Sequence, residues 1–340
     1  MTGATPIPKP HYNWRDTLLS RQLGTRLPIM ATGLQWLANA EYVAAAVDAG
    51  MMGFISAATF SDTSALRDEI QRCRELLNGR AFGVNVSMLP KLLPGDRTDE
   101  IMSLIVEERI AVVETSGRDP SPYVAALKAG GCSVIHKVPQ LRHALKAEAA
   151  GVDAVILVGA ECGGHPGESP IGTMVQGALA ARALTIPFAL GGGIATGEQI
   201  VAALALGASG VAIGTHFLVS DEIPAHAKYK CRLVEAQPGD TTLIMASLRN
   251  SMRVLRNDTT AMVEALEGQG INDIQQLMPY VRGSLGKAAY ASGDWRQGAL
   301  SVGQGVGLTA RSAPLADIVA ELEAEADTAL ARLSNIMEPS

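Results

Sequence analysis

Short apolar runs alternate with Ala-rich stretches of helical periodicity through the first two thirds of the chain. Several of these stretches end in Gly and are followed at once by an apolar run, as Ala150 and Gly151 precede residues 154–158. A glycine just past a helix can take the left-handed conformation that ends it. The runs themselves, such as VDAVILVG and SGVAIG, are continuously apolar, which is typical of strands buried on both faces. The pattern therefore predicts helices alternating with parallel strands.

Eight strands are predicted in this way. They lie near residues 27–31, 52–56, 81–86, 110–115, 133–137, 154–158, 187–191 and 210–214. Helical patterns lie between them, for instance over Asn39–Ala49, Ser64–Leu77 and Thr196–Leu206. Eight consecutive βα units favour a closed (β/α)8 TIM barrel over an open doubly wound sheet, so the predicted fold class is α/β.

The pattern changes after Asp221. Helical stretches are predicted over Leu243–Leu255, Thr260–Glu267 and Leu315–Leu333, and no strand is predicted there. We expect a barrel over residues 1–220 and a mostly helical addition over 221–340, whose Gly-rich segment 298–307 returns toward the barrel. The addition either packs on the barrel side or covers the barrel mouth, where this fold places its active sites and where a cover would shape the substrate pocket.

Composition and charge narrow the class of protein. The net charge is −6 without a basic cluster, which argues against a nucleic-acid partner or an anionic membrane. No run approaches the roughly 18 to 20 apolar residues of a membrane span. Four scattered cysteines lack metal-ligand spacing, and the N-terminus lacks an apolar leader. These features predict a soluble cytoplasmic protein without a metal site.

A glycine-rich segment follows the sixth strand, Gly159–Gly167, and contains His165. Glycines let the backbone come close to a ligand, and an imidazole can take up or release a proton near neutral pH. We expect His165 to face the barrel mouth as a catalytic residue. The alternative is a glycine-rich turn with an incidental surface histidine.

Glycines also follow the seventh strand, as Gly191-Gly192-Gly193, and the eighth, as Gly214-Thr215. In barrels of this kind the loops after strands seven and eight commonly bind a phosphate through backbone N–H groups and a helix N-terminus. Together they predict a phosphorylated ligand.

These segments carry a resemblance to a known family. The chain resembles the nitronate monooxygenase (2-nitropropane dioxygenase-like) flavoprotein family, which also includes FMN-dependent enoyl-thioester reductases and NADH:quinone reductases. The similarity runs from Pro28 to about Leu333. Its segments are PIMATG (28–33), FGVNV (82–86), ECGGHPG (161–167), GGGIATG (191–197), GVAIGTHFL (210–218) and GQGVGL (303–308).

The resemblance implies FMN as cofactor, with its phosphate on the backbone of Gly192, Gly193, Gly214 and Thr215. It implies that Asn85, otherwise a strand-end turn residue, hydrogen-bonds the flavin. His165 takes the place of the family's catalytic histidine, a base for the substrate's α-proton in nitronate oxidation and a proton donor in the reductases. The other positions that it places at FMN are Thr32, Gly33, Lys137, Val158, Gly163, Gly164, Ala212 and Gln304.

Several positions depart from the family pattern. Thr32-Gly33-Leu34 stands where many members have Ala-Pro-Met, and Cys162 where Ala is usual. Val158 and Ala212 occupy positions where well-known nitronate monooxygenases carry Gln near the flavin. These departures point away from the best-characterised monooxygenases.

Three further features have two interpretations each. Lys137 ends the fifth strand, either as a solvated rim charge or, beside His165, as a catalytic cation that stabilises the negative charge of reduced flavin. Cys162 is either a small packing residue or a reactive thiol. Three arginines at helical spacing form either a solvated stripe or a site for an anionic substrate such as a CoA thioester. They are Arg249, Arg253 and Arg256.

The leading functional prediction is an FMN-dependent oxidoreductase that oxidises alkyl nitronates with O2. The second is NAD(P)H-dependent reduction of an enoyl thioester, on CoA or an acyl carrier protein, or of a quinone. A non-flavin barrel acting on a sugar phosphate and a flavoprotein used only for binding are more remote. The expected partners are a small-molecule substrate, NAD(P)H as a possible co-substrate, and a second copy of the chain in a homodimer.

Overall fold

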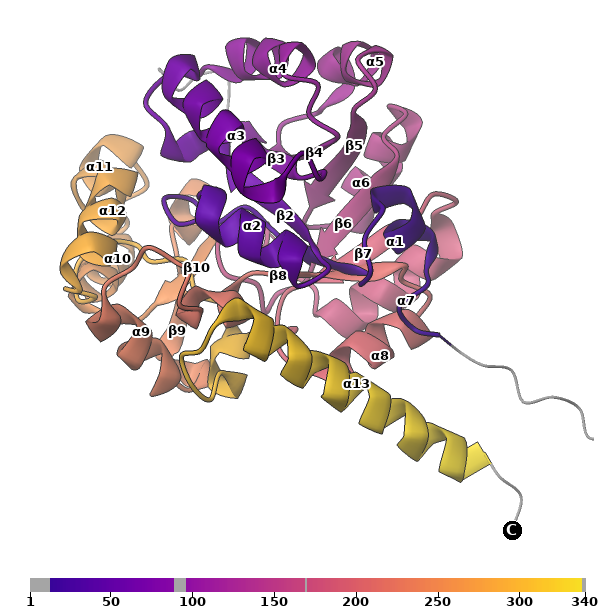
Figure 1. Ribbon diagram of the computed structural model, residues 1–340. Coiled ribbons are helices and arrows are strands. Elements are labelled where there is room, and N and C mark those ends of the chain that lie inside the picture. The colour runs from indigo at the N-terminus through magenta and orange to yellow at the C-terminus, as the bar shows by residue number, and fades with distance from the viewer. Residues whose placement is uncertain (1–12, 89–95, 169, 338–340) are drawn as a thin grey trace, which may run out of the picture.

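Eight parallel strands close into a barrel in the computed structural model, which describes residues 13–88, 96–168 and 170–337. β1 pairs with β2 on one side and with β8 on the other, with Met30 opposite Ala212, so the sheet has no free edge. This confirms the predicted (β/α)8 barrel (Figure 1). The strands are β1 (Ile29–Ala31), β2 (Met52–Ser56), β3 (Gly83–Met88), β4 (Val112–Gly117), β5 (Ser133–Val138), β6 (Ala154–Val158), β7 (Phe188–Gly191) and β8 (Gly210–Ile213).

Helices follow the strands around the outside of the barrel, and capping side chains mark the starts of α2, α3 and α8. The Asn39 side chain accepts from the Tyr42 N–H at the start of α2, and Thr196 and Gln199 form a reciprocal capping box at the start of α8. The helices of the barrel are α2 (Ala40–Asp48), α3 (Thr63–Leu77), α4 (Thr98–Glu107), α5 (Ser121–Ala129), α6 (Leu141–Ala149), α7 (Thr173–Ala183) and α8 (Gly197–Ala205).

A short N-terminal helix, α1 (Leu18–Leu23), closes the amino-terminal end of the barrel. Its Leu19 and Leu23 belong to the apolar cluster inside the barrel, together with Phe54 and Ile156. Leu19 packs beside the first residue of β8, Gly210, where a Cβ atom would lie 2.8 Å from Leu19 Cδ2. Only the carboxyl-terminal end of the barrel is therefore left for a ligand.

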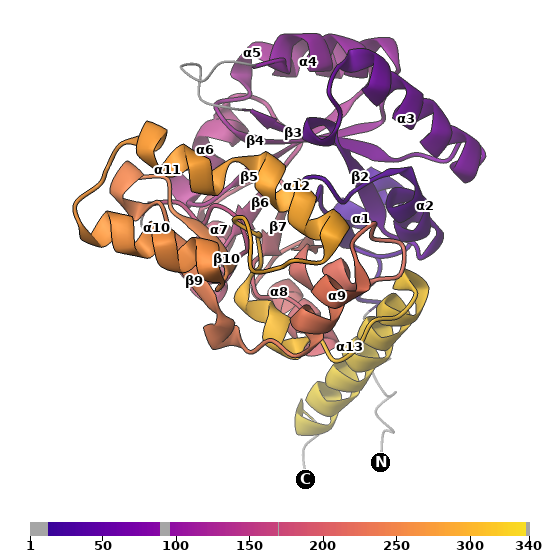
Figure 2. The same ribbon diagram turned by 90° about the vertical axis from the view of Figure 1, so that its left-hand side faces the viewer.

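The chain after β8 forms the addition. It contains α9 (Ala227–Val234), β9 (Thr241–Ile244), β10 (Met252–Leu255), α10 (Asp258–Gly268), α11 (Ile274–Val281), α12 (Gly283–Ser292) and α13 (Leu315–Met337), with short 3-10 turns η2 (Thr215–Val219) and η5 (Gln304–Leu308). In Figure 2 helices α10 to α12 lie in front of the barrel strands.

The predicted helix over Leu243–Leu255 is wrong. This segment forms an antiparallel hairpin, in which β9 and β10 pair with Leu243 opposite Arg253. Its turn contains Met245 and Arg249 in the left-handed conformation, which a helix does not allow. The apolar positions of the segment fit helical spacing and strand alternation alike, and β-branched Thr241 and Thr242 favour the strand.

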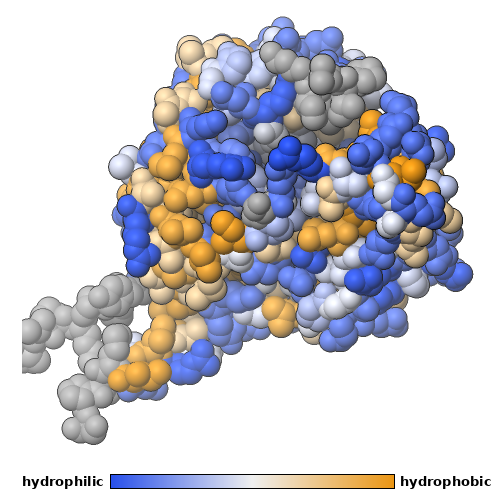
Figure 3. Space-filling view, turned by 180° about the vertical axis from the view of Figure 1, so that it is seen from behind, coloured by the Kyte–Doolittle hydropathy of each residue, from blue (hydrophilic) through white to orange (hydrophobic). Residues whose placement is uncertain are grey.

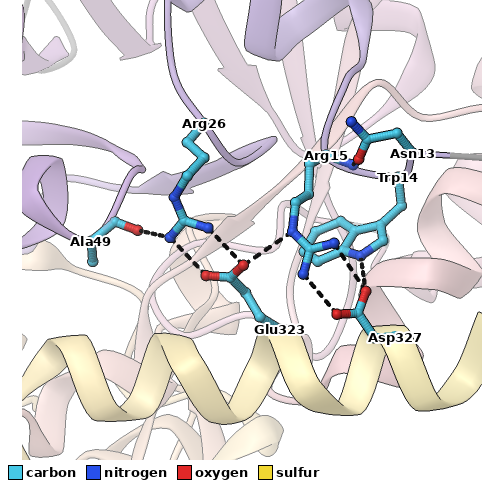
Figure 4. Close-up of polar contacts among 7 residues, drawn as sticks. All are labelled: Asn13, Trp14, Arg15, Arg26, Ala49, Glu323 and Asp327. Carbon is cyan, nitrogen blue, oxygen red and sulfur yellow. Dashed lines mark hydrogen bonds and ion pairs between the residues drawn. The ribbon is translucent and has the colours of Figure 1, made fainter.

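The last helix, α13, packs on α8 and α2 and is tied to the N-terminal segment by charged side chains (Figure 4). Glu323 accepts from Arg26 Nη1 at 2.6 Å and from Arg15 Nε at 3.0 Å. Asp327 accepts from Trp14 Nε1 at 2.8 Å. Residues near opposite ends of the chain thus meet on one side of the barrel.

Apolar side chains gather on one face of the molecule, over α6 and α7 (Figure 3). Leu145, Met174, Val175 and Leu179 are the large apolar residues exposed there. Within the part of the chain that the structure describes, no helix is both long and apolar enough to cross a membrane. The described residues also hold no group of three or more His, Cys, Asp or Glu side chains that suits a metal ion.

Candidate active site

Polar side chains on the adjacent strands β3, β4 and β5 point into the carboxyl end of the barrel. Glu114 lies two residues after Val112, and Lys137 two residues after Ile135; Val112 and Ile135 both belong to the interior cluster. Since side chains alternate along a strand, Glu114 and Lys137 point inward as well. Asn85 is the register partner of Glu114 and shares its direction.

Lys137 forms an ion pair with Glu114, from Nζ to Oε1. The Glu114 side chain is 0% exposed and that of Lys137 is 22% exposed. The second carboxylate oxygen of Glu114 accepts from the backbone N–H of Gly33 at 3.3 Å. Lys137 therefore lies inside the barrel mouth against a buried carboxylate, not in open solvent at the rim.

Glu114 did not emerge from the sequence as a site residue. It lies in the run AVVETSG, whose apolar residues predict only a buried strand. The one local signal for a site is the charged residue inside an otherwise apolar run, because a carboxylate that is buried in a strand requires a partner nearby.

Asn85 is 2% exposed, and its Nδ2 has no hydrogen-bond acceptor among the described residues. The loop after β1 lies directly against it, since a Cβ atom on Gly33 would lie 2.3 Å from Asn85 Cβ. Thr32, also buried, begins that loop and donates its N–H to Ile213 O at 3.4 Å. A buried amide donor is thus left facing the barrel interior, which suits a ligand acceptor.

The opposite wall of the mouth is apolar. Val158 on β6, Gly191 on β7 and Ala212 on β8 are register neighbours and share the inward direction. A Cβ atom on Gly191 would lie 3.3 Å from Val158 Cγ1 and 3.4 Å from Ala212 Cβ. The mouth is therefore polar on the β3–β5 side and apolar on the β6–β8 side.

The loop that carries His165 is held from two directions. Gly164 and Arg253 form an antiparallel bridge, which joins the loop to β10. The Gly-rich segment crosses the loop at Gly163, where a Cβ atom would lie 2.8 Å from Gly303 N, so only glycine allows this approach. A Cβ atom on Gly167 would lie 2.9 Å from Pro139 Cβ, which places the loop beside the end of β5.

The His165 side chain is exposed to solvent, but enough protein lies around the imidazole to change its pKa. Desolvation lowers the pKa of His165 below its ordinary value of 6.5, which favours the neutral imidazole. Apart from its two chain neighbours, no residue lies within 4 Å of the place where a Cβ of Gly164 would stand, so the loop is open at the residue before His165. The arrangement is that of a proton acceptor or donor with room for a substrate.

Two neighbours of His165 have structural roles. The Glu161 carboxylate accepts from the Thr173 N–H at 3.1 Å and from Thr173 Oγ1 at 2.8 Å, and so caps α7. Cys162 is buried, and this burial raises the pKa of its thiol to about 12. The Cys162 side chain is therefore a neutral thiol near pH 7, as expected of a packing residue.

The glycines after β7 and β8 leave backbone donors available. Gly192 and Gly193 have φ values of 94° and 76°, which disfavour other residues. Among the hydrogen bonds of the described residues, the N–H groups of Gly192, Gly193 and Gly214 donate to no protein acceptor. Thr215 Oγ1 accepts from Gly303 N at 2.9 Å, so its hydroxyl anchors the Gly-rich segment.

The N-terminus of α8 is occupied by the protein itself. Gln199 Oε1 accepts from the N–H groups of Ala195 at 2.8 Å and Thr196 at 3.2 Å, and Glu325 on α13 accepts from Gly197 N–H at 2.8 Å. The sequence suggested that a helix N-terminus contributes to the phosphate site after strand seven. In α8 these first N–H groups have acceptors within the protein, which leaves the N–H groups of Gly192 and Gly193 as free donors after β7 among the described residues.

The Gly-rich segment contacts all three glycine loops. Gln304 donates its N–H to Glu161 O at 2.8 Å, and a Cβ atom on Gly305 would lie 3.2 Å from Gly193 O. Gln304 is half-buried beside the loop that carries His165.

The three arginines do not form a helical stripe. Arg253 is buried on β10 and donates from Nε to Ala160 O at 3.1 Å and from Nη1 to Thr241 Oγ1 at 3.2 Å. Arg249 lies in the hairpin turn and pairs with Glu168 at 3.3 Å. Arg256 follows the strand and is exposed. Because the segment is a hairpin, the prediction of one arginine face is wrong.

Comparisons with known proteins show to which family the chain belongs. Residues 16–325 match the family model described as nitronate monooxygenase. The chain is 32% identical over 256 residues to (3aS,4S,5R,7aS)-5-hydroxy-7a-methyl-1-oxo-octahydro-1H-indene-4-carboxyl-CoA dehydrogenase of Rhodococcus jostii RHA1, covering 75% of this chain and 69% of that relative.

Two solved structures have the same architecture. FabK of Thermotoga maritima, an enoyl reductase, superposes with a TM-score of 0.86 at 31% identity, over 95% of this chain and 99% of that one. A nitroalkane oxidase of Streptomyces ansochromogenes superposes with a TM-score of 0.78 at 29% identity, over 93% and 99%. The chain therefore belongs to the nitronate monooxygenase family, a family of FMN-dependent oxidoreductases.

Proposed function

We propose that FMN binds in the barrel mouth and that this protein oxidises alkyl nitronates with O2, with His165 as the general acid or base. The observation that carries the cofactor site is the unsatisfied Nδ2 of Asn85, a buried donor that faces the barrel interior without a protein acceptor. An unpaired buried amide costs about 1–3 kcal/mol, which a bound acceptor offsets.

The other residues of the mouth fit the parts of the same group. The free N–H groups of Gly192, Gly193 and Gly214 suit a phosphate, and the apolar wall of Val158 and Ala212 suits an aromatic ring. Lys137 adds a cation on the polar side. When bound, FMN would supply hydride and electron transfer.

His165 moves the proton. As a neutral imidazole it accepts a proton from the carbon next to the nitro group of a nitroalkane, which leaves the nitronate that is then oxidised. The lowered pKa of His165 keeps this basic form populated near pH 7. The bridge between Gly164 and Arg253 fixes the loop just before His165, so the imidazole is placed by backbone contacts.

Acyl thioesters are the second candidate substrates, and the apolar wall favours them. Val158 and Ala212 leave the β6–β8 side without side-chain amides, which suits an acyl chain better than a polar nitronate. Two relatives support this class, since one is a CoA-thioester dehydrogenase and the other an enoyl reductase. In that reaction His165 would act as the proton donor or acceptor at the carbon next to the thioester.

The identity of the cofactor is tested by releasing it from the purified protein. We expect purified protein supplied with FMN to be yellow, and heating to release FMN without covalent attachment. Recovery of FAD, or a well-folded protein that retains no flavin, would contradict the cofactor proposal.

The substrate is tested by anaerobic mixing with propionate 3-nitronate, NADH, NADPH and a saturated acyl-CoA in turn, while flavin absorbance is followed. Bleaching by the nitronate followed by reoxidation with O2 supports the first candidate. Bleaching by a nicotinamide, with reoxidation by an enoyl thioester but no response to the nitronate, supports the second. Bleaching by the acyl-CoA supports the thioester class in the oxidative direction.

A further inference from the structure

The buried carboxylate of Glu114, inside the barrel mouth, is paired with Lys137. Lys137 is the only lysine or arginine on β3, β4 and β5. Glu114 has no exposed surface. Its Oε1 forms an ion pair with Lys137 Nζ, and its Oε2 accepts a hydrogen bond from the Gly33 N–H. Its two contacts come from β5 and from the loop after β1, which are on different sides of β4.

The energetics of this pair argue for a role beyond stability. Removing a carboxylate from water costs several kcal/mol, and its attraction to a lysine often repays only part of that cost. An apolar pair of similar volume would pack the barrel at least as well. The lysine side chain is also long and flexible, so without a partner its ammonium would move among several positions.

We propose that Glu114 is a positioning residue that holds the Lys137 ammonium in the barrel mouth, toward the flavin. The proposal rests on the proposed function only in its last step, the effect on FMN. Its first step, that Glu114 restrains Lys137, concerns the protein alone.

The contact between Glu114 and Gly33 explains how the restraint is anchored. The Gly33 N–H orients one oxygen of the carboxylate, which leaves the other directed at Lys137 Nζ. Gly33 is itself fixed, because it lies directly against Asn85. The ammonium is thereby tied through Glu114 to the loop that borders the unsatisfied Asn85 amide.

The first experiment measures Lys137 without flavin. Apoprotein is treated with a trace of acetic anhydride, and acylation of Lys137 is compared by mass spectrometry with that of Lys128, which pairs with Asp153 at 2.7 Å. Pairing with the Glu114 carboxylate limits the positions from which the Lys137 amine can reach the anhydride, so Glu114→Gln should raise the Lys137 to Lys128 ratio roughly tenfold. The matched variant Asp153→Asn should lower this ratio, by releasing Lys128 instead.

The second experiment measures the flavin. Lys137→Met should weaken the binding of reduced FMN about tenfold relative to that of oxidised FMN. This tenfold change in the ratio of the two dissociation constants lowers the midpoint potential by about 30 mV. In the Glu114→Gln background the same change should be below about twofold, because Lys137 is no longer held there. A purely structural role of Glu114 would leave the effect of Lys137→Met equal in both backgrounds.

The outcomes separate the two proposals. If the native protein binds no FMN, the proposed function fails while the acylation result still decides whether Glu114 restrains Lys137. If FMN binds and Glu114→Gln leaves both the acylation ratio and the Lys137→Met effect unchanged, the positioning role is refuted. If Glu114→Gln does not fold, Glu114→Asp replaces it, since the shorter carboxylate cannot reach both Gly33 and Lys137.

Discussion

Gly164 and Arg253 exchange two backbone hydrogen bonds, from Gly164 N to Arg253 O at 3.0 Å and from Arg253 N to Gly164 O at 2.6 Å. The Arg253 guanidinium reaches back to Ala160 O in the same loop. The hairpin of the addition therefore determines where the loop before His165 lies, and the barrel alone does not.

This relationship predicts the effect of Arg253→Met. The backbone bridge remains, but Ala160 O and Thr241 Oγ1 lose their donor, which should cost about 1–3 kcal/mol in the free energy of unfolding. Turnover should fall about tenfold or more while FMN stays bound, because the loop is less well fixed. Urea unfolding and steady-state kinetics measure the two effects.

Arg249→Met is the matched control. Arg249 lies on the same hairpin but is 80% exposed, and among the described residues it pairs with Glu168 alone, so its loss should change stability by less than about 0.5 kcal/mol. Equal losses for the two variants would mean that the buried guanidinium does not hold the loop.

His165→Asn should keep FMN but slow the proton-transfer step by about 10²–10⁴-fold. The pH profile of the native enzyme separates the two candidate reactions. As a base, His165 must be neutral, so kcat/KM should be flat near pH 7 and fall only below 6.5, since its pKa is lowered. As an acid, it must be protonated, and kcat/KM should instead fall as the pH rises toward 7. Unchanged turnover of the variant, with chemistry shown to limit the rate, would exclude His165 from the reaction.

Two other buried histidines should lower the free energy of unfolding in mild acid. Burial lowers the pKa values of His136 and His216 to about 4. In the unfolded chain both titrate near 6.5, so between pH 6.5 and 4 the unfolded state binds more protons and stability falls with the pH. Each histidine should contribute a loss of about 1.5 kcal/mol between pH 6.5 and 5.

Urea unfolding at several pH values measures this slope. His136→Asn should remove the share of this slope that His136 contributes, and the other buried histidines keep theirs. Unfolding free energies that stay constant from pH 6.5 to 5 would contradict the prediction.

Glu323→Ala should detach part of α13. The Glu323 side chain is only 16% exposed and serves both Arg15 and Arg26, so we expect a loss of about 1–2 kcal/mol in unfolding free energy. Glu321→Ala on the same helix removes an exposed pair with Arg311 and should cost less than about 0.5 kcal/mol. Chemical unfolding of both variants tests the difference, and a larger loss for Glu321→Ala would disagree with it.

The barrel could be predicted from features that lie within short stretches of the sequence. Asn39 and Thr196 were placed at helix starts, and both cap helices. The continuous apolar runs became strands because parallel strands in a barrel are covered on both faces. The hairpin β9–β10 was missed because its apolar spacing fits either period, and the choice depends on contacts with the barrel loop at Gly164.

The site was predicted less completely than the fold. Motifs with unusual glycine content led to His165 and the phosphate loops, since such glycines are visible in one stretch of sequence. Glu114 and Glu325 were missed because their roles depend on distant partners, Lys137 and Gly197. No local pattern reveals that a glutamate near the end of the chain caps a helix that begins 128 residues earlier.

The position of α13 also has a consequence for the order of folding. β1 and β8 form the seam of the barrel, and they are separated by nearly the whole barrel sequence. Closing so long a loop is slow, because its entropy is lost before the contacts form. Since α13 lies across α8 and α2, on the two sides of this seam, a helix that is synthesised more than a hundred residues after β8 fastens it. A chain in which α13 has not yet been synthesised would hold β1 and β8 as open edges, so barrel closure is coupled to the synthesis of α13.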